Sequence, residues 1–241
     1  MLEFTLSAKH AKNLVKALEN ISEDAVFQFD STGLHISVCD TFRNRLLESS
    51  LSADSFETYT CDSSLDLGII VSRLRDVTKT LRAKESVSGS YSLDDPNFLI
   101  FNANGVTRRL RLVNTDLLKS PPPIVYEDYI YQATVESKRL QDFLKAASNF
   151  HTVEVAVNSS LVSFSSQEGE DEVSIRFTPE EVNLNLELTD ALSTHGIIDL
   201  AKGLSTINDL VLIRGGPTIP ISFSWSWGAG TSSTCYISRW E

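Results

Sequence analysis

Three lysines on one short segment have the spacing needed to hold a polyanion. Lys9, Lys12 and Lys16 stand three and four residues apart in "AKHAKNLVKALE", residues 8–19. In a helix this spacing places their ammonium groups on one neighbouring face. Clustered ammonium groups bind phosphate oxygens by displacing condensed counterions, without reading any base. The whole chain is nevertheless acidic, with a formal net charge of −11, so the charge has to be counted segment by segment.

A helix is predicted to carry these lysines. Ser7 is a suitable N-cap residue because its hydroxyl can accept a hydrogen bond from the first helical turn. The apolar residues recur three and four apart and predict one buried stripe beside the lysines: Ala8, Ala11, Leu14, Val15 and Leu18.

Three more predicted helices share this basic character, at 72–84, 137–147 and 197–207. With 8–19, they hold 12 of the 21 Lys and Arg residues but only four of the 32 acids. Their net charge is therefore +8, and the rest of the chain carries −19. A solvated helix face usually mixes the two signs, so four helices of one sign indicate a positive face opposite an acidic one.

The helices belong to an internal duplication. "LVKALENI" (14–21) matches "FLKAASNF" (143–150) at an offset of 129, which places Lys145 on Lys16 and Lys138 on Lys9. Alternating segments such as "AVFQFD" and "LHISV" predict strands around each helix. Three consecutive prolines at 121–123 interrupt the alternation and predict an extended linker. The prediction is an α+β chain with an N-terminal domain (1–113), a connector (114–127) and a C-terminal domain (128–241).

Catalytic, metal and nucleotide sites are not indicated. Asp94 and Asp95 are adjacent, so on an extended chain their carboxylates point apart. "RGGP" and "WGAG" supply turn glycines without the strand-to-helix context of a phosphate-binding loop. The three cysteines form no CxxC pair and are expected to be reduced, and the four histidines lack metal-ligand spacing. No enzyme activity, metal or cofactor is expected, and no membrane helix, since the apolar runs are short.

The sequence resembles the DNA sliding clamps of the proliferating cell nuclear antigen (PCNA) family, in their archaeal and eukaryotic form. The resemblance runs over the whole chain and rests on these stretches: "AKNLVKALENISEDAVFQFDSTGLHISVCD" (11–40), "SFETYTCD" (55–62), "LGIIVSRLRDVTKTL" (67–81), the proline-containing connector, "LAKGL" (200–204), "IPISF" (219–223) and "TCYISRWE" (234–241). It implies a trimeric ring with pseudo-sixfold symmetry, built from duplicated βαβββ-type clamp domains with helices inside and sheets outside. The implied function is a DNA polymerase processivity factor for replication and repair that encircles duplex DNA.

The resemblance also implies which cations face DNA. The positions that match the family directly are Lys12, Lys79, Lys145 and Lys202. Helical spacing adds seven further candidates: Lys9, Lys16, Arg73, Arg75, Arg82, Lys138 and Arg139.

Partner proteins are implied to bind through a short hydrophobic motif that enters a groove under the connector. These partners are a DNA polymerase, the flap endonuclease, the ligase and a clamp loader. The groove residues that match the family are Cys39, Leu46, Leu117, Leu118, Ile124, Pro220, Tyr236 and Ile237. Asn44 stands where an apolar residue is usual and "SRWE" replaces the usual C-terminal segment, which leaves partner preference open.

Ring closure is implied to join the strands 106–113 and 170–177 of neighbouring subunits. The first is basic and the second begins with acids, which suits a head-to-tail contact: Arg108, Arg109 and Arg111 against Glu170, Asp171 and Glu172. A homotrimer and a heterotrimer both remain open. So do two other functions, a checkpoint-type clamp subunit and a scaffold without DNA binding. The expected location is the nucleus in a eukaryote and the cytoplasmic nucleoid in an archaeon.

Overall fold

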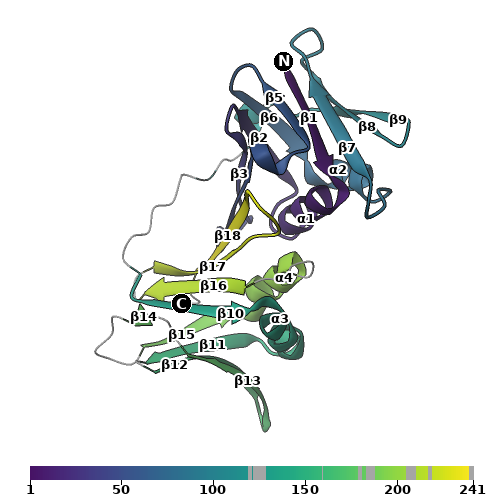
Figure 1. Ribbon diagram of the computed structural model, residues 1–241. Coiled ribbons are helices and arrows are strands. Elements are labelled where there is room, and N and C mark those ends of the chain that lie inside the picture. The colour runs from purple at the N-terminus through teal and green to yellow at the C-terminus, as the bar shows by residue number, and fades with distance from the viewer. Residues whose placement is uncertain are drawn as a thin grey trace. The chain divides into compact units, whose positions relative to one another are not determined.

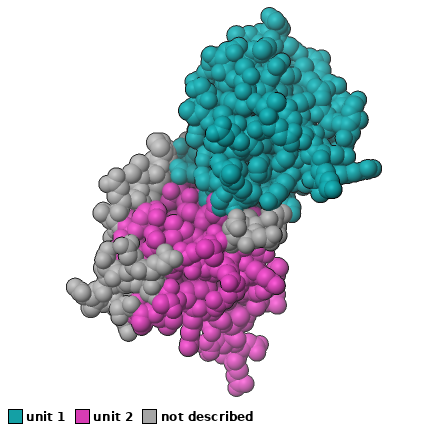
Figure 2. Space-filling model, in the orientation of Figure 1, with its two compact units in different colours: residues 1–39, 47–122, 226–233 teal, residues 40–46, 123–225, 234–241 magenta. Residues whose placement is uncertain are grey.

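The computed structural model describes residues 1–118, 121, 129–158, 160–178, 181–182, 188–204, 210–216 and 219–238. The chain forms two compact units, coloured separately in Figure 2. Unit 1 comprises Met1–Cys39, Leu47–Pro122 and Ser226–Ser233, and unit 2 comprises Asp40–Leu46, Pro123–Trp225 and Thr234–Glu241. Each unit thus includes a short piece of the other half of the sequence. The domain boundaries 1–113, 114–127 and 128–241 stay a prediction.

Unit 1 contains two helices and two antiparallel sheets (Figure 1). One sheet has the order β5-β1-β7-β8-β9, and the other strands follow the order β4-β3-β2-β6. The elements in chain order are β1 (Leu2–Ser7), α1 (Ala8–Glu19), β2 (Asp24–Asp30), β3 (Gly33–Cys39), β4 (Arg45–Ser52), η1 (Ala53–Ser55), β5 (Thr58–Cys61), β6 (Leu65–Ile70), α2 (Val71–Thr78), β7 (Ser86–Tyr91), β8 (Phe98–Ala103), β9 (Val106–Arg111) and η2 (Thr115–Leu117).

Unit 2 repeats this order of strands and helices. Its strands follow the orders β14-β10-β16-β17-β18 and β13-β12-β11-β15, each the counterpart of a strand order in unit 1. The elements in chain order are β10 (Tyr131–Glu136), α3 (Ser137–Ala146), η3 (Ala147–Asn149), β11 (Thr152–Asn158), β12 (Leu161–Glu168), β13 (Asp171–Phe177), β14 (Glu181–Val182), β15 (Leu188–Ser193), α4 (Thr194–Leu204), β16 (Leu210–Gly216), β17 (Ile219–Trp225) and β18 (Thr231–Ile237). The chain is therefore an α+β protein with mostly antiparallel strands and few helices.

Helix α1 has the predicted bounds and the predicted cap. The Ser7 hydroxyl accepts a hydrogen bond from the backbone N–H of His10 at 3.3 Å. The predicted apolar stripe is buried along its length. At the other end the Asn20 side chain donates to the carbonyl of Lys16 at 2.7 Å, which satisfies one of the orphan carbonyls of the last turn.

Helix α2 is shorter than the predicted helix at 72–84. The predicted C-terminal end was wrong. The helix ends at Thr78, and the Thr78 and Thr80 hydroxyls donate to the carbonyls of Arg75 and Val77. The Arg75 carbonyl also accepts the backbone N–H of Lys79 at 2.9 Å, so only the Thr80 bond takes a carbonyl that a further helical N–H would use. Likewise α4 begins at Thr194 rather than 197, and the predicted residues 205–207 lie outside the described part.

In each unit an aromatic side chain of one strand covers a glycine of the paired strand, although the two pairs do not occupy duplicated positions. Phe4 of β1 pairs with Gly89 of β7, and Tyr131 of β10 pairs with Gly215 of β16. A Cβ atom at Gly89 would lie 2.2 Å from Phe4 Cζ, and one at Gly215 would lie 2.4 Å from the Tyr131 hydroxyl oxygen. Each aromatic ring therefore lies over its paired glycine, where no other residue type fits.

The core of each unit contains a cluster of phenylalanine rings. The Phe4 ring lies 5.6 Å from Phe29, 5.7 Å from Phe56 and 6.3 Å from Phe101 between centroids. In unit 2 the Phe164 ring lies 6.2 Å from Phe143, 5.9 Å from Phe177 and 6.2 Å from Phe223. The predicted thiols are free: Cys235 is buried, and Cys39 and Cys61 are partly exposed.

The partly buried imidazole of His10 should make the stability of unit 1 depend on pH. His10 Nδ1 lies 3.2 Å from the carbonyl oxygen of Ser55, and a Cβ atom on Gly228 would meet its Nε2 at 2.9 Å. Burial lowers the pKa of His10, and the hydrogen bond with Ser55 raises it by a smaller amount. Below about pH 6.5 the unfolded chain therefore binds more protons than the folded one, so stability falls as the pH falls.

We expect His10→Gln to remove part of this pH dependence. Urea unfolding at about pH 7.5 and about pH 5.5 should show a larger loss of unfolding free energy in the parent than in the variant. An equal loss in the two proteins would show that His10 does not carry it.

Candidate nucleic-acid and partner interfaces

The predicted DNA-facing cations lie on the four helices and in the turn after α2. Helices α1 and α2 pack together in unit 1, and α3 and α4 pack together in unit 2. Lys12 and Lys16 are partly buried, and the other nine are exposed: Lys9, Arg73, Arg75, Lys79, Arg82, Lys138, Arg139, Lys145 and Lys202. Each helix therefore presents cations to solvent, but the contacts of these side chains differ.

Lys12 ties the two helices of unit 1 together. Its ammonium donates to the carbonyl of Leu81, just beyond the end of α2, at 2.6 Å. Gln141, which lies 129 residues further along the chain, donates to the carbonyl of Leu204 at the end of α4, also at 2.6 Å. The two halves thus use the same position to hold the chain at the C-terminal end of the neighbouring helix, or just beyond it. This contact occupies one donor of Lys12, which sequence spacing could not show.

Several exposed cations already have an acidic partner on the same unit. Lys79 Nζ lies 2.5 Å from Asp76 Oδ1, and Lys202 Nζ lies 2.8 Å from Asp199 Oδ1. The hydrogen bond from Lys79 is the main cause that lowers the pKa of Asp76. Longer pairs of 3.9 Å join Arg75 to Glu19 and Arg82 to Glu85. Exposed pairs of this kind are weak, but a phosphate has to compete with them.

Two arginines lie beside edge strands. Arg73 of α2 donates to the carbonyl of Arg111 in β9 at 3.2 Å, and Arg139 of α3 donates to the carbonyl of Arg176 in β13 at 3.4 Å. The Arg139 guanidinium also lies 5.6 Å from the centre of the Phe177 ring. Each arginine therefore ties a helix to the outermost strand of its unit.

Four of the predicted DNA-facing lysines keep their ammonium groups free of hydrogen bonds and ion pairs with the described residues: Lys9, Lys16, Lys138 and Lys145. They form two pairs of duplicated positions, one on α1 and one on α3. A phosphate can bind these side chains without displacing a protein group. They are the strongest candidates for phosphate contacts on the geometry of the chain.

The predicted closing strands are both at sheet edges. Strand β9 is the last strand of its sheet in unit 1, and β13 is the last of its sheet in unit 2. Arg108 donates to the carbonyl of Asp76 at 2.9 Å, and Arg109 pairs with Asp95 at 2.6 Å and lies 4.1 Å from the centre of the Phe98 ring. Arg111 is exposed and, among the described residues, its side chain has no ion-pair partner.

The acidic residues at the start of β13 also lack ion-pair partners among the described residues. Glu170, Asp171 and Glu172 are exposed and form no ion pair with the described residues. Beside β9, a notch of about 170 Å³ opens between α2 and the β8–β9 hairpin. Its lining includes Val106, which is 55% exposed, so an apolar patch lies directly on this unpaired edge.

The predicted groove residues are divided between the units. Cys39, Leu117 and Leu118 belong to unit 1, and Leu117 is 76% exposed. In unit 2, Leu46 and Ile237 are buried, and Pro220 and Tyr236 are partly buried. Ile124 and residues 239–241 of "SRWE" lie outside the described residues.

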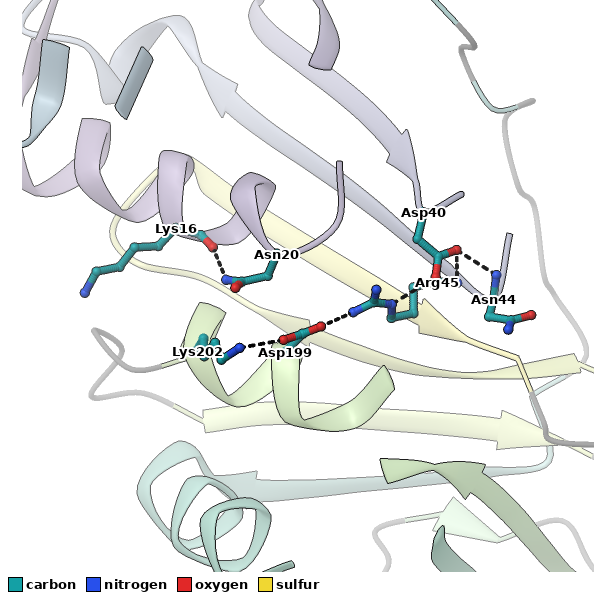
Figure 3. A network of polar contacts seen from close by, with 7 residues as sticks. All are labelled: Lys16, Asn20, Asp40, Asn44, Arg45, Asp199 and Lys202. Atoms are coloured by element: carbon teal, nitrogen blue, oxygen red, sulfur yellow. Dashed lines mark hydrogen bonds and ion pairs between the residues drawn. The ribbon is translucent and has the colours of Figure 1, made fainter. Parts of the chain in front are cut away.

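A restrained turn at 40–45 in unit 2 was missed at the sequence level (Figure 3). Asp40 is only 8% exposed, and its Oδ1 accepts the backbone N–H groups of Asn44 and Arg45 at 2.8 and 3.1 Å. Its Oδ2 lies 3.1 Å from Arg45 Nε. The turn holds Arg43 at φ 58° and leaves Phe42 82% exposed. An Asp followed at the fourth position by Asn is the only local signal for such a turn.

The fold and these surfaces define a clamp-type binding protein, with cationic helices and open strand edges. Comparison with known proteins agrees: the model of the N-terminal domain of proliferating cell nuclear antigen matches residues 1–117. Homologues from the PCNA or DNA polymerase sliding clamp family, whose members are not enzymes, match most of the chain. Homology therefore gives it the function of a DNA polymerase sliding clamp.

Relatives match over most of the chain. Identity is 26% with the proliferating cell nuclear antigen of Chaetomium thermophilum, covering 98% of this chain and 97% of the relative. It is 22% with the DNA polymerase sliding clamp of Cenarchaeum symbiosum, covering 92% and 87%. A solved structure, the C-terminal region of FEN-1 bound to A. fulgidus PCNA, matches with a TM-score of 0.91 at 17% identity, covering 100% of this chain and 99% of that one. The structural match shows the fold.

Neither a metal site nor a membrane helix is found in the part of the chain that the structure describes. No group of three or more His, Cys, Asp or Glu side chains there could hold a metal ion. No helix among those residues is long and apolar enough to cross a membrane.

The contacts of the lysines predict a difference between Lys12 and Lys16 in duplex binding. Lys16→Ala should lower the slope of log K against log salt by about 0.9, the value for one lost phosphate contact. Lys12→Ala should change the slope less and lower the melting temperature more, because it removes the contact with Leu81. Fluorescence titration of a duplex at several salt concentrations measures the slope. An equal or larger slope change in Lys12→Ala would contradict the ranking.

Proposed function

We propose that three copies of the chain close into a ring that encircles duplex DNA and slides along it. The ring acts as a processivity factor that tethers a DNA polymerase and repair enzymes to their template. It works where the chromosomal DNA lies, in the nucleus of a eukaryote or in the nucleoid of an archaeal cytoplasm.

The ring is supported by a difference between duplicated strands. Strands β18 and β4 pair with each other, whereas their duplicates β9 and β13 do not. Within unit 1, residues 231–233 of β18 lie beside β4: the Ser49 and Ser233 hydroxyl oxygens are 2.6 Å apart, and the N–H of Ser52 donates to the carbonyl of Gly230 at 2.8 Å. The duplication makes β9 the counterpart of β18 and β13 the counterpart of β4. Both counterparts, β9 and β13, lie at sheet edges in the described part of the chain.

A second copy can supply the missing pairing. If β9 of one copy pairs with β13 of the next, the pairing of β18 with β4 seen in unit 1 is repeated between chains. The contact joins two different surfaces, so it is head-to-tail and generates a ring when the rotation closes. Three copies, with two repeats each, give six equivalent junctions. The pairing also removes the two open edges, which otherwise invite uncontrolled association.

Charge supports the same pairing. Arg111 on β9 and the acids Glu170, Asp171 and Glu172 on β13 are exposed and unpaired with the described residues. Arg108 and Arg109 make contacts within their own unit, so Arg111 is the cation of this set most available to a neighbouring copy. Opposite charges across an interface favour the correct encounter.

The lysines of the helices suit a sliding contact. Phosphate contacts hold a duplex without reading its sequence, and exposed flexible lysines can exchange one phosphate for the next. Lys9, Lys16, Lys138 and Lys145 are the primary set in this proposal. The paired side chains Lys79 and Lys202 contribute after their acids are displaced.

Partner binding is proposed through the groove residues that the family resemblance indicates. The similar A. fulgidus structure contains the C-terminal region of FEN-1, which makes a flap endonuclease the first partner to test. A polymerase, a ligase and an ATP-driven clamp loader would use the same kind of motif. The exposed Phe42 and the polar Asn44 next to the groove residue Leu46 set the preference among them.

The encircling function predicts that retention on DNA depends on topology. After loading onto a nicked circular plasmid by the matching clamp loader, the protein should stay bound through gel filtration in salt high enough to suppress simple phosphate contacts. Cutting the plasmid once should release it, because a ring slides off a free end. Equal retention on circular and cut DNA would contradict encirclement, and so would no retention on either.

A further inference from the structure

One carboxylate in unit 2 is shared by two cations from different elements. Asp199 Oδ1 lies 2.8 Å from Lys202 Nζ, one turn along α4, and Asp199 Oδ2 accepts a hydrogen bond of 2.5 Å from the Arg45 guanidinium (Figure 3). The Lys202 side chain is 61% exposed, whereas those of Arg45 and Asp199 are 16% and 23% exposed. Lys202 can therefore leave the carboxylate easily, and Arg45 is held in place.

Arg45 fastens the 40–46 segment to helix α4. Its guanidinium lies between Asp40 in its own turn and Asp199 in the helix. The charges of Asp40, Arg45 and Asp199 act on the buried thiol of Cys235, the residue next to Tyr236 in sequence. The segment fixed in this way ends at Leu46, and both Leu46 and Tyr236 are predicted groove residues. The position of the groove-lining segment thus depends on how tightly Asp199 holds Arg45.

We propose that Arg45 and Asp199 are positioning residues through which the partner groove and the DNA-facing Lys202 are linked by competition for one carboxylate. This inference rests on the proposed clamp function. When a phosphate takes the ammonium of Lys202, Asp199 is left to Arg45 alone, and their attraction increases. The turn is then held more firmly in the conformation that a partner peptide meets, which lowers the ordering cost of binding.

The link is reciprocal. A peptide bound against the 40–46 segment holds Arg45 on Asp199. The ion pair between Lys202 and Asp199 is then weaker, and the Lys202 ammonium is available to a phosphate. Each ligand must then raise the affinity for the other by the same factor. A clamp on DNA would in this way bind its partners more tightly than a free clamp. Weak exposed ion pairs give an expected factor of about two to four.

Removing Lys202 should therefore mimic DNA. In the absence of DNA, Lys202→Met should bind a fluorescent peptide carrying the C-terminal region of FEN-1 about two- to fourfold more tightly than the parent. Saturating duplex should tighten peptide binding of the parent by a similar factor and leave the variant unchanged. A purely structural role of Lys202 would weaken peptide binding or leave it unaltered.

Asp199→Asn supplies the second arm. It keeps the shape of the side chain but loses the charge for which the two cations compete, so its peptide affinity should fall. Adding Lys202→Met to Asp199→Asn should then give no improvement. Lys84→Met is the matched control, because Lys84 is exposed, has no ion-pair partner among the described residues and belongs to neither proposed surface. Its peptide affinity should equal that of the parent.

The outcomes separate this inference from the function on which it rests. If the parent binds the peptide and the duplex but Lys202→Met binds the peptide no more tightly, the link through Asp199 is wrong and the clamp remains. Improvement by Lys202→Met that persists in the Asp199→Asn background also overturns it. If the parent binds neither peptide nor duplex, the proposed function fails and this inference falls with it.

Discussion

Unpaired backbone along β9 and β13, two of the strands at sheet edges, is the feature from which the proposed assembly of this chain follows. Each is the duplicate of a strand that finds a neighbour within the chain, and each exposes backbone donors and acceptors along one side. Charged residues limit accidental pairing at both edges, because β9 is basic and β13 begins with acids. The same charges favour pairing of one edge with the other. A chain built from two repeats thus has its association surfaces specified by the repeat itself.

Each helix is held in place by the sheet under its apolar stripe and by side-chain contacts with neighbouring elements. Their apolar stripes pack on the sheets, and a side chain at one duplicated position, Lys12 or Gln141, reaches the end of the neighbouring helix. Arg73 and Arg139 tie the helices to the edge strands. Pairing at the edges and the position of the cations are therefore parts of one arrangement. The lysines that remain free of these contacts are the ones available to phosphate.

Much of this fold could be predicted from the sequence because its signals are local. The bounds of α1, its Ser7 cap and its buried stripe follow from helical spacing, and most predicted strands appear within two residues of their expected ends. The end of α2 could not be predicted from periodicity: Leu81 keeps the helical spacing, but the helix ends at Thr78 and the Thr80 hydroxyl bonds to the Val77 carbonyl. A side-chain bond of this kind leaves the apolar pattern unchanged.

The site was less predictable because its contacts are not local. The contact of Lys12 with Leu81 spans 69 residues, and the pair of Arg45 with Asp199 spans 154. Spacing identified Lys12 and Lys202 as cations on a helix face but gave no sign that Lys12 bonds to the turn after α2 and that Lys202 shares a carboxylate. Arg45 and Asp40 carried no signal beyond a possible turn. Charge counted by helix predicted the basic surface, and only the packed structure shows which of its side chains are occupied.

Sedimentation equilibrium of the purified chain tests the central claim about the open edges most directly. Pairing of β9 with β13 predicts a single species of three times 26.7 kDa at micromolar concentration. That species should lose mass when Arg111 is changed to Glu, and should recover when Glu172 is changed to Arg in the same chain. A parent chain that stays at the mass of one subunit throughout this range would contradict the account. An assembly unaffected by either substitution would show that other surfaces hold the copies together.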